Sequence, residues 1–139
     1  MPPISFKAIA IAFTAEVAAD GVIRTILFGL FAHGMVTAEM GPEEFEKVTL
    51  TVLQTTDYVP WALALGIATT IGGGYLAARI AKLIPYYHGL AMGIAGILFI
   101  LLLWPDEAGW LEYLGLLITI PVSLVGAHVA KKHMEPDPA

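Results

Sequence analysis

Four long runs of apolar residues dominate the sequence, and they constrain what the chain can fold into more than any other feature. The runs cover about residues 8–35, 59–80, 86–104 and 110–130. A helix that crosses the hydrocarbon core of a membrane needs about 20 mostly apolar residues, and each run is close to or above that length. We therefore predict an all-α membrane protein, a bundle of four transmembrane helices, with residues 1–139 forming a single transmembrane domain.

The composition supports lipid as the solvent around most of this chain. Hydrophobic residues make up 58% of its 139 residues and charged residues only 14%, whereas soluble domains carry about 25% charged residues. A chain this short cannot bury so much apolar surface within itself. The absence of cysteine excludes disulfides and thiolate metal sites. The sequence contains no stripe of basic residues, the feature that would indicate a nucleic acid partner.

The loop after the first run contains a short amphipathic pattern. In residues 42–54, the apolar side chains of Phe45, Val48, Val52 and Leu53 share one helical face. The pattern is typical of a surface helix at the membrane interface. An ordinary polar loop explains the same residues equally well, and both interpretations remain open.

The N-terminal segment has some features of a secretory signal peptide. Lys7 precedes an apolar run and then the small residues Val17, Ala18 and Ala19. However, Glu16 falls just before that position, and the apolar run continues for more than a dozen residues beyond it. We therefore expect this segment to remain as part of the first helix.

Charges in the short loops predict the orientation of the helices. With four spans, nearly all basic residues outside the helices fall on one side, and Lys47 alone falls on the other. The residues on the basic side are Lys7, Arg79, Lys82, Lys131 and Lys132. Lysine and arginine are enriched in cytoplasmic loops, which predicts that both termini are cytoplasmic.

Small residues at four-residue spacing predict how the helices pack. Close backbone approach between such residues is a main source of helix association in lipid. The positions concerned are Gly66 and Gly74 in the second run, Gly89 and Gly93 in the third, and Gly115 in the fourth. We expect these glycines to form helix–helix contacts rather than a ligand site.

One group of residues in the first run could carry chemistry. Glu16, Asp20 and Arg24 are four residues apart, so successive members turn by only about 40° and share one helical face. Charged groups at the centre of a membrane helix cost about 2.5 to 3.5 kcal/mol each on insertion scales. Asp20 and Arg24 are spaced to form an ion pair. Glu16 then requires a proton, a donor from another helix or a bound cation.

Three interpretations of this group remain open. It is a polar or ion-binding site within the membrane, or a charge network that determines which helix packs where. Alternatively, Glu16 lies near the cytoplasmic interface and reaches water. The histidines, His33, His88, His128 and His133, lie near the predicted helix ends and are expected to be interfacial. No pair of them has the spacing of a zinc site, so we predict no metal and no cofactor.

The segment from Ile71 to Ala81, with the sequence IGGGYLAARIA, resembles one found in small four-helix bacterial integral membrane proteins of uncharacterised function. The pair His88 and Gly89, and the helix end from Pro121 to Lys131, fit the same resemblance. The resemblance covers about the last two thirds of the chain. It implies a location in the bacterial inner membrane and brings no activity, cofactor or catalytic residue with it.

Two functions from different classes follow. The first is a non-enzymatic membrane protein that acts through helix association, with itself or with a membrane partner. The alternative is a component of an oligomeric transporter for protons, ions or small solutes, with Glu16, Asp20 and Arg24 along its polar path. An enzyme is not expected, because no nucleophile elbow, phosphate loop or dinucleotide fingerprint is present.

Overall fold

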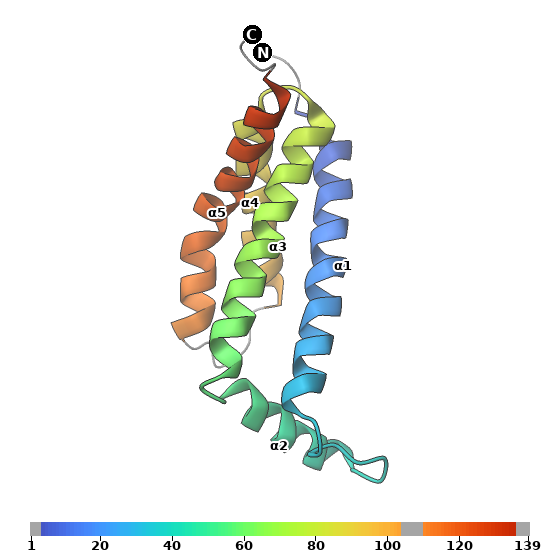
Figure 1. Ribbon diagram of the computed structural model, residues 1–139. Coiled ribbons are helices and arrows are strands. Elements are labelled where there is room, and N and C mark those ends of the chain that lie inside the picture. Colours follow the sequence, from blue (N-terminus) through green and yellow to red (C-terminus); the bar gives the residue numbers. More distant parts are fainter. Residues whose placement is uncertain (1–3, 104–109, 136–139) are drawn as a thin grey trace. The chain divides into compact units, whose positions relative to one another are not determined.

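In the part that the computed structural model describes, residues 4–103 and 110–135, all of the regular secondary structure is α-helical. The helices are α1 (Phe6–Phe31), α2 (Pro42–Leu53), α3 (Tyr58–Ala81), α4 (Pro85–Leu102) and α5 (Trp110–Met134) (Figure 1). Each predicted run therefore corresponds to one long helix. The chain divides into two compact units, which we call unit 1 (Met1–Val17 and Ile67–Ala139) and unit 2 (Ala18–Gly66).

Local sequence signals explain where the helices begin. The Ser5 hydroxyl accepts a hydrogen bond from the Ala8 backbone N–H at 3.3 Å, which caps α1. Both α2 and α4 have a proline in the first turn, where its missing N–H costs no hydrogen bond. The short connection between α3 and α4 turns through Lys82 and Ile84, which have positive φ angles of 58° and 41°.

Three of the described helices are long and apolar enough to cross a membrane. They are Tyr58–Ala81, Pro85–Leu102 and the segment Tyr113–Met134 of α5. These are helices of a membrane protein, as the sequence predicted. The prediction of four spanning helices is corrected to three by these criteria. Helix α1 has 26 residues and is therefore long enough, but it carries Glu16, Asp20 and Arg24 within its length.

In unit 1, α5 packs closely on α3 and α4 through small residues. A Cβ built on Gly74 would lie 2.8 Å from the Ser123 Oγ, and one built on Gly126 would lie 2.7 Å from the backbone nitrogen of Tyr75. Real Cβ atoms essentially never come this close to other atoms. The Ser123 hydroxyl is fully buried and donates a hydrogen bond of 2.8 Å to the Gly89 carbonyl. Glycine at these positions therefore allows the backbones to approach.

Helix α5 contains Pro121 and stays helical on both sides of it. Proline cannot donate a backbone hydrogen bond to the carbonyl four residues earlier, which here belongs to Leu117. A nearby hydroxyl group could donate to the Leu117 carbonyl instead. The Thr119 hydroxyl does not, because it donates its single proton to the Gly115 carbonyl at 2.5 Å. The helix thus accommodates the proline while its neighbouring turns keep their own bonds.

The first half of α1 also belongs to unit 1 and packs against α3 and α4. Ala12 of α1, Ala77 of α3 and Met92 of α4 form a buried apolar cluster. Phe13 and Phe99 add an edge-to-face ring contact with centroids 5.4 Å apart. Within unit 1, α1 and α3 run in opposite directions (Figure 1), so Glu16, four residues after Ala12, meets Gly73, four residues before Ala77.

Unit 2 has its own small core where α2 meets the end of α1 and the start of α3. Its buried members are Leu27, Ala32, Val52 and Tyr58. The rings of Phe31 and Tyr58 meet edge to face, with centroids 5.5 Å apart. The short amphipathic helix is therefore present as α2, with Val52 on its buried side and its glutamates exposed.

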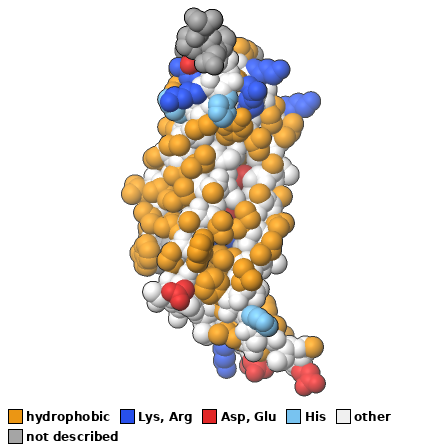
Figure 2. Space-filling model, viewed as in Figure 1, with side chains coloured by type: hydrophobic (Ala, Val, Ile, Leu, Met, Phe, Trp, Pro, Cys, Tyr) orange, Lys and Arg blue, Asp and Glu red, His pale blue; other side chains and the backbone are white. Residues whose placement is uncertain are grey.

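Basic side chains gather at one end of unit 1 (Figure 2). Lys7 begins α1, Arg79 and Lys82 lie at the end of α3, and Lys131 and Lys132 lie in the last turns of α5. The Lys131 ammonium sits 5.6 Å from the centre of the Tyr86 ring at the start of α4. The predicted clustering of these five cations is thus present within unit 1.

Candidate functional site

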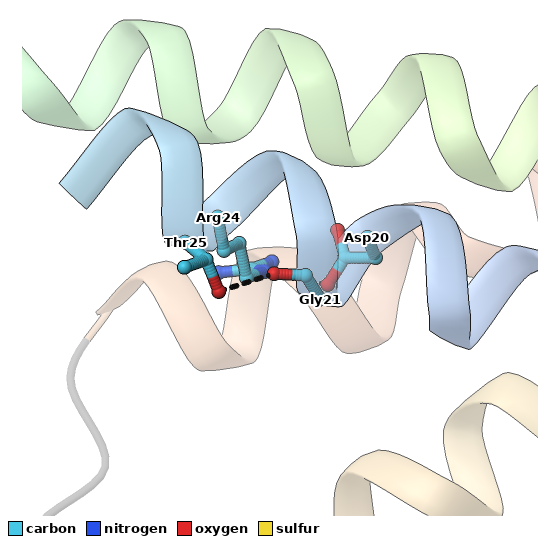
Figure 3. Close-up of polar contacts among 4 residues, drawn as sticks. All are labelled: Asp20, Gly21, Arg24 and Thr25. Atoms are coloured by element: carbon cyan, nitrogen blue, oxygen red, sulfur yellow. Dashed lines mark hydrogen bonds and ion pairs between the residues drawn. The ribbon is translucent and has the colours of Figure 1, made fainter. Parts of the chain in front are cut away.

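Asp20 and Arg24 form an ion pair on α1, within unit 2. The Arg24 Nε donates to the Asp20 Oδ2 at 2.6 Å (Figure 3). Beside the pair, the Thr25 hydroxyl donates to the Gly21 carbonyl at 2.8 Å. The four-residue spacing alone predicted this pair, because residues i and i+4 are neighbours on a helix surface.

Arg24 also extends over α3. A Cβ built on Gly66 would lie 3.7 Å from the Arg24 Nη2, so the guanidinium lies over the glycine backbone at ordinary contact distance. Gly66 was expected to form a helix–helix backbone contact. Its missing side chain instead leaves room for a charged group of the neighbouring helix.

Glu16 lies in unit 1, where its carboxyl group packs directly on Gly73 of α3. A Cβ on Gly73 would lie 2.8 Å from the Glu16 Cδ and closer still to its Oε2. The same Cβ would be 3.0 Å from the methyl group of Met92, a side chain that is 1% exposed. The carboxyl therefore occupies the space that a side chain at position 73 would fill.

This position is well inside the helical part of unit 1. Gly73 lies eight residues before the end of α3 at Ala81, which is about 12 Å along the axis at 1.5 Å per residue. Met92 lies seven residues after the start of α4 at Pro85, about 10 Å along that axis. Both helices qualify as membrane spans, so Glu16 contacts them away from their ends.

The structure therefore separates the predicted group into two parts. Asp20 and Arg24 satisfy one another in unit 2, whereas Glu16 contacts Gly73 and Met92 in unit 1. Gly73 was not among the glycines predicted to form helix contacts. The signal that could have identified it is its antiparallel register with Glu16, which no single helix reveals.

The predicted packing glycines differ in what they contact. Gly74 meets Ser123, Gly89 meets Ala127, and Gly93 meets Ile120, where a Cβ would lie 2.9 Å from the Ile120 Cα. The prediction that Gly115 forms a helix–helix contact is corrected, because no described atom lies within 4 Å of a Cβ at that position. The close approach of α5 begins a turn later, where the Thr119 methyl would lie 3.1 Å from a Cβ on Gly96.

The prediction for His88 is also corrected. It was expected at the membrane interface, but its side chain is fully buried within the protein. Its Nε2 accepts a hydrogen bond of 2.9 Å from the Ser5 backbone N–H. Its Nδ1 lies 3.2 Å from the Ile84 carbonyl. His88 thus connects the start of α1 to the start of α4, a contact between residues 83 positions apart that no local pattern indicates.

The other three histidines, His33, His128 and His133, are exposed. His128 Nδ1 lies 2.8 Å from the Tyr86 hydroxyl, and His133 Nδ1 lies 3.4 Å from the Tyr75 hydroxyl. His33 is exposed at the end of α1. Within residues 4–103 and 110–135, no three His, Asp or Glu side chains are grouped closely enough to hold a metal ion.

Comparison with known proteins adds no relative: no protein-family model, no curated protein and no solved structure matches this chain. The site is therefore defined by the residues that the structure brings together. These are an ion pair on one part of α1 and a single carboxyl group packed against two membrane-type helices on another.

Proposed function

We propose that this chain is a non-enzymatic, multi-pass membrane protein that acts by associating with a second copy of itself within the bilayer. The observation that carries the proposal is the outward face of α1 in unit 2. Ala18, Gly21, Thr25 and Gly29 recur at three- and four-residue spacing and are all exposed. No described atom lies within 4 Å of a Cβ at Gly21 or Gly29.

The other close-packing positions are already occupied within the chain. Gly74, Gly89, Gly93 and Gly126 contact neighbouring helices in unit 1, so they are not available to another molecule. Small residues at four-residue spacing let two helix backbones approach closely in lipid. The α1 face, in contrast, remains open at both of its glycines. A two-fold dimer would use the same face of both copies.

We further propose that α1 is embedded in the membrane beside α3, as a fourth membrane helix. Its charged side chains turn toward glycines of α3, Glu16 toward Gly73 and Arg24 toward Gly66. Its outward side presents apolar residues, with Val22 and Ile26 about 60% exposed. Charged groups in membrane helices face the interior and pair with one another. In a bacterial inner membrane, the basic end of unit 1 would be cytoplasmic.

Cysteine cross-linking tests the association directly, because the chain contains no cysteine of its own. Thr25→Cys places a thiol on the proposed face, and Leu98→Cys places one on the exposed side of α4. After oxidation in native membranes, we expect a disulfide-linked dimer from the first variant and monomer from the second. Equal cross-linking of both variants, or of neither, would contradict this interface.

A second test replaces a small residue on the exposed face of α1 with a larger one. In the Thr25→Cys background, Gly21→Ile should lower the cross-linked fraction by at least roughly tenfold, which corresponds to about 1.4 kcal/mol of association free energy. Val22→Ile adds a methylene group at the adjacent exposed position and is the matched control. If both substitutions lower cross-linking equally, the effect comes from bulk anywhere on α1.

A second candidate function, proton or cation transport, is favoured by the position of Glu16. A carboxyl group packed against two membrane-type helices is typical of proton and ion pathways. Proteoliposomes containing the wild type should then show a flux that Glu16→Gln abolishes and Glu39→Gln, in the exposed loop, retains. Absence of flux in all three proteins would remove this candidate.

A further inference from the structure

We propose that the basic end of unit 1 binds the headgroup phosphate of an anionic phospholipid, through Tyr86 of α4 and His128 and Lys131 of α5. This lipid partner is additional to the second copy proposed above. Its site does not depend on the position of α1, because α4 and the Tyr113–Met134 segment of α5 both qualify as membrane spans. Surplus charge, converging donors and adjoining apolar side chains in unit 1 each point to such a lipid.

Positive charge at this end exceeds the negative charge that the described residues supply. Among residues 4–103 and 110–135, the Lys131 ammonium pairs with the Glu135 carboxylate at 3.5 Å, and the other cations at this end have no ion pair. These are Lys7, Arg79, Lys82 and Lys132. The Lys131 and Glu135 side chains are 45% and 61% exposed, and an exposed pair contributes little. An anion from outside the chain can therefore neutralise charge here.

Donor groups of two helices converge on the side chain of Tyr86, at the start of α4. The Lys131 ammonium lies 5.6 Å from the centre of the Tyr86 ring. The Tyr86 hydroxyl lies 2.8 Å from His128 Nδ1. His128 and Lys131 are three residues apart in α5 and are therefore neighbours on its surface. An ammonium, an imidazole and a phenol thus meet where α4 begins and α5 approaches its end.

In either tautomer of His128, this group keeps a donor for a phosphate oxygen. If the Tyr86 hydroxyl donates to Nδ1, the neutral imidazole carries its proton on Nε2, and that N–H remains available. If Nδ1 donates to the hydroxyl oxygen, the hydroxyl proton remains available instead. Both side chains are exposed, so a ligand can reach the remaining donor. The Lys131 ammonium adds charge-assisted N–H donors.

Apolar side chains continue from these donors along both helices. On α4, Leu90 lies one turn beyond Tyr86 and is 38% exposed. On α5, Pro121 and Leu117 come seven and eleven residues before His128, intervals that return to nearly the same helical face, and both are exposed. Basic and apolar side chains adjoin at this end of unit 1 (Figure 2). A phospholipid has its phosphate and acyl chains in the same order, whereas free phosphate has nothing to place against the apolar part.

The net charge of the lipid decides which phospholipid fits. Lys132 is exposed and follows His128 by four residues, so it adds a second ammonium on that side of α5. Phosphatidylglycerol carries a net negative charge on its phosphate. Phosphatidylcholine carries the same phosphate beside a quaternary ammonium, which the two lysines would repel. Basic groups at the ends of membrane helices favour anionic headgroups for this reason.

Native mass spectrometry of the purified protein in detergent, with equal amounts of phosphatidylglycerol and phosphatidylcholine, tests the site. We expect the wild type to retain phosphatidylglycerol several-fold more than phosphatidylcholine. Lys131→Gln should lower phosphatidylglycerol binding by about fivefold, which corresponds to about 1 kcal/mol, the usual contribution of one basic residue near anionic lipid. No preference in the wild type, or no loss in Lys131→Gln, would overturn the proposal.

Lys7→Gln is the matched control, because Lys7 is an exposed lysine at the same end of unit 1 but on another side of α4. It follows Ser5, whose N–H bonds to His88, and His88 is about 200° around α4 from Tyr86. Lys7→Gln should therefore leave phosphatidylglycerol binding nearly unchanged. An equal loss in Lys7→Gln would mean that any cation at this end suffices, and would contradict the site.

Glu135→Gln should change binding in the opposite direction. It removes the carboxylate that competes with phosphate for Lys131, so phosphatidylglycerol binding should rise. A gain of binding cannot come from misfolding. Unchanged or weaker binding in Glu135→Gln would contradict the role of Lys131.

A soluble competitor distinguishes lipid from free phosphate. Glycerol phosphate has the charged group without acyl chains, and a molar excess of it should leave phosphatidylglycerol bound. Displacement of the lipid would show that phosphate alone occupies the site and would overturn the assignment to lipid. Cross-linking through Thr25→Cys reports association separately, so failure of one proposal is distinguishable from failure of the other.

Discussion

The imidazole of His88 contacts backbone groups through both of its nitrogens. Its Nε2 accepts the Ser5 N–H, so it carries no proton, and its Nδ1 then donates to the Ile84 carbonyl. We assign this tautomer from the two partners. Because the ring is fully buried, a substitution there removes packing and leaves a backbone donor without its acceptor.

At the residue scale, His88→Ala should therefore destabilise the protein. The unsatisfied Ser5 N–H alone should cost about 1–3 kcal/mol, in addition to the cavity. Thermal unfolding in detergent would show a lower Tm for His88→Ala than for the wild type, whereas His33→Ala, at an exposed position, would leave it unchanged. Equal shifts for both variants would mean that the Ser5 contact contributes little.

The Asp20–Arg24 pair leads to a second prediction at this scale. The pair is exposed in the structure, so its environment has a low dielectric only through the proposed position of α1 in the bilayer. There, removing one partner of a charge pair is strongly destabilising, whereas replacing both is often nearly neutral. Asp20→Asn should therefore lower the yield of membrane-inserted protein, and the double variant Asp20→Asn, Arg24→Gln should recover most of it. Recovery would be absent if Arg24 contributed chiefly through its contact over Gly66.

At the scale of the helices, glycines that look alike in the sequence have different consequences. Cβ atoms on Gly74 and Gly126 would meet backbone atoms of the facing helix. A Cβ on Gly73 would meet the ends of two side chains, and one on Gly72 would meet no described atom within 4 Å. Backbone atoms move only when whole helices move, whereas side chains can rotate away.

Alanine substitutions along this run should follow that order. Gly74→Ala and Gly126→Ala should each destabilise the protein by about 1–3 kcal/mol, the usual cost of overpacking. Gly72→Ala, the matched control, should be neutral or slightly stabilising because alanine favours helix. Unfolding of the three variants in detergent measures the difference, and a Gly72→Ala protein as unstable as Gly74→Ala would refute the packing assignment.

For the whole molecule, the decisive question is how many helices lie in the membrane. Three qualify by length and apolarity, and α1 is proposed as the fourth because its charged residues turn toward α3. With four, both termini lie on the same side of the membrane, and with three they lie on opposite sides. Within unit 1, the start of α1 and the end of α5 lie at the same end (Figure 1).

Reporter fusions test this number. A reporter active only in the cytoplasm should be active at either terminus, and a reporter active only outside should be inactive at both. A control fusion in the loop between α1 and α2, near Glu39, should give the opposite pattern. Termini on opposite sides would place α1 outside the hydrocarbon core and contradict its proposed position in the membrane.

Local patterns along the chain are sufficient to predict the class of the protein and its long helices. Apolar runs, prolines at the helix starts and four-residue charge spacing depend on neighbours along the chain, so the four long helices and the Asp20–Arg24 pair were predictable, whereas α2 stayed open between a helix and a loop. The packing partners were not predictable. They depend on the register between helices that are distant in sequence. Examples are the burial of His88, the contact of Glu16 with Gly73, and the absence of described atoms within 4 Å of a Cβ at Gly115. That register is set by the shapes of whole helix surfaces, and only the tertiary structure decides it.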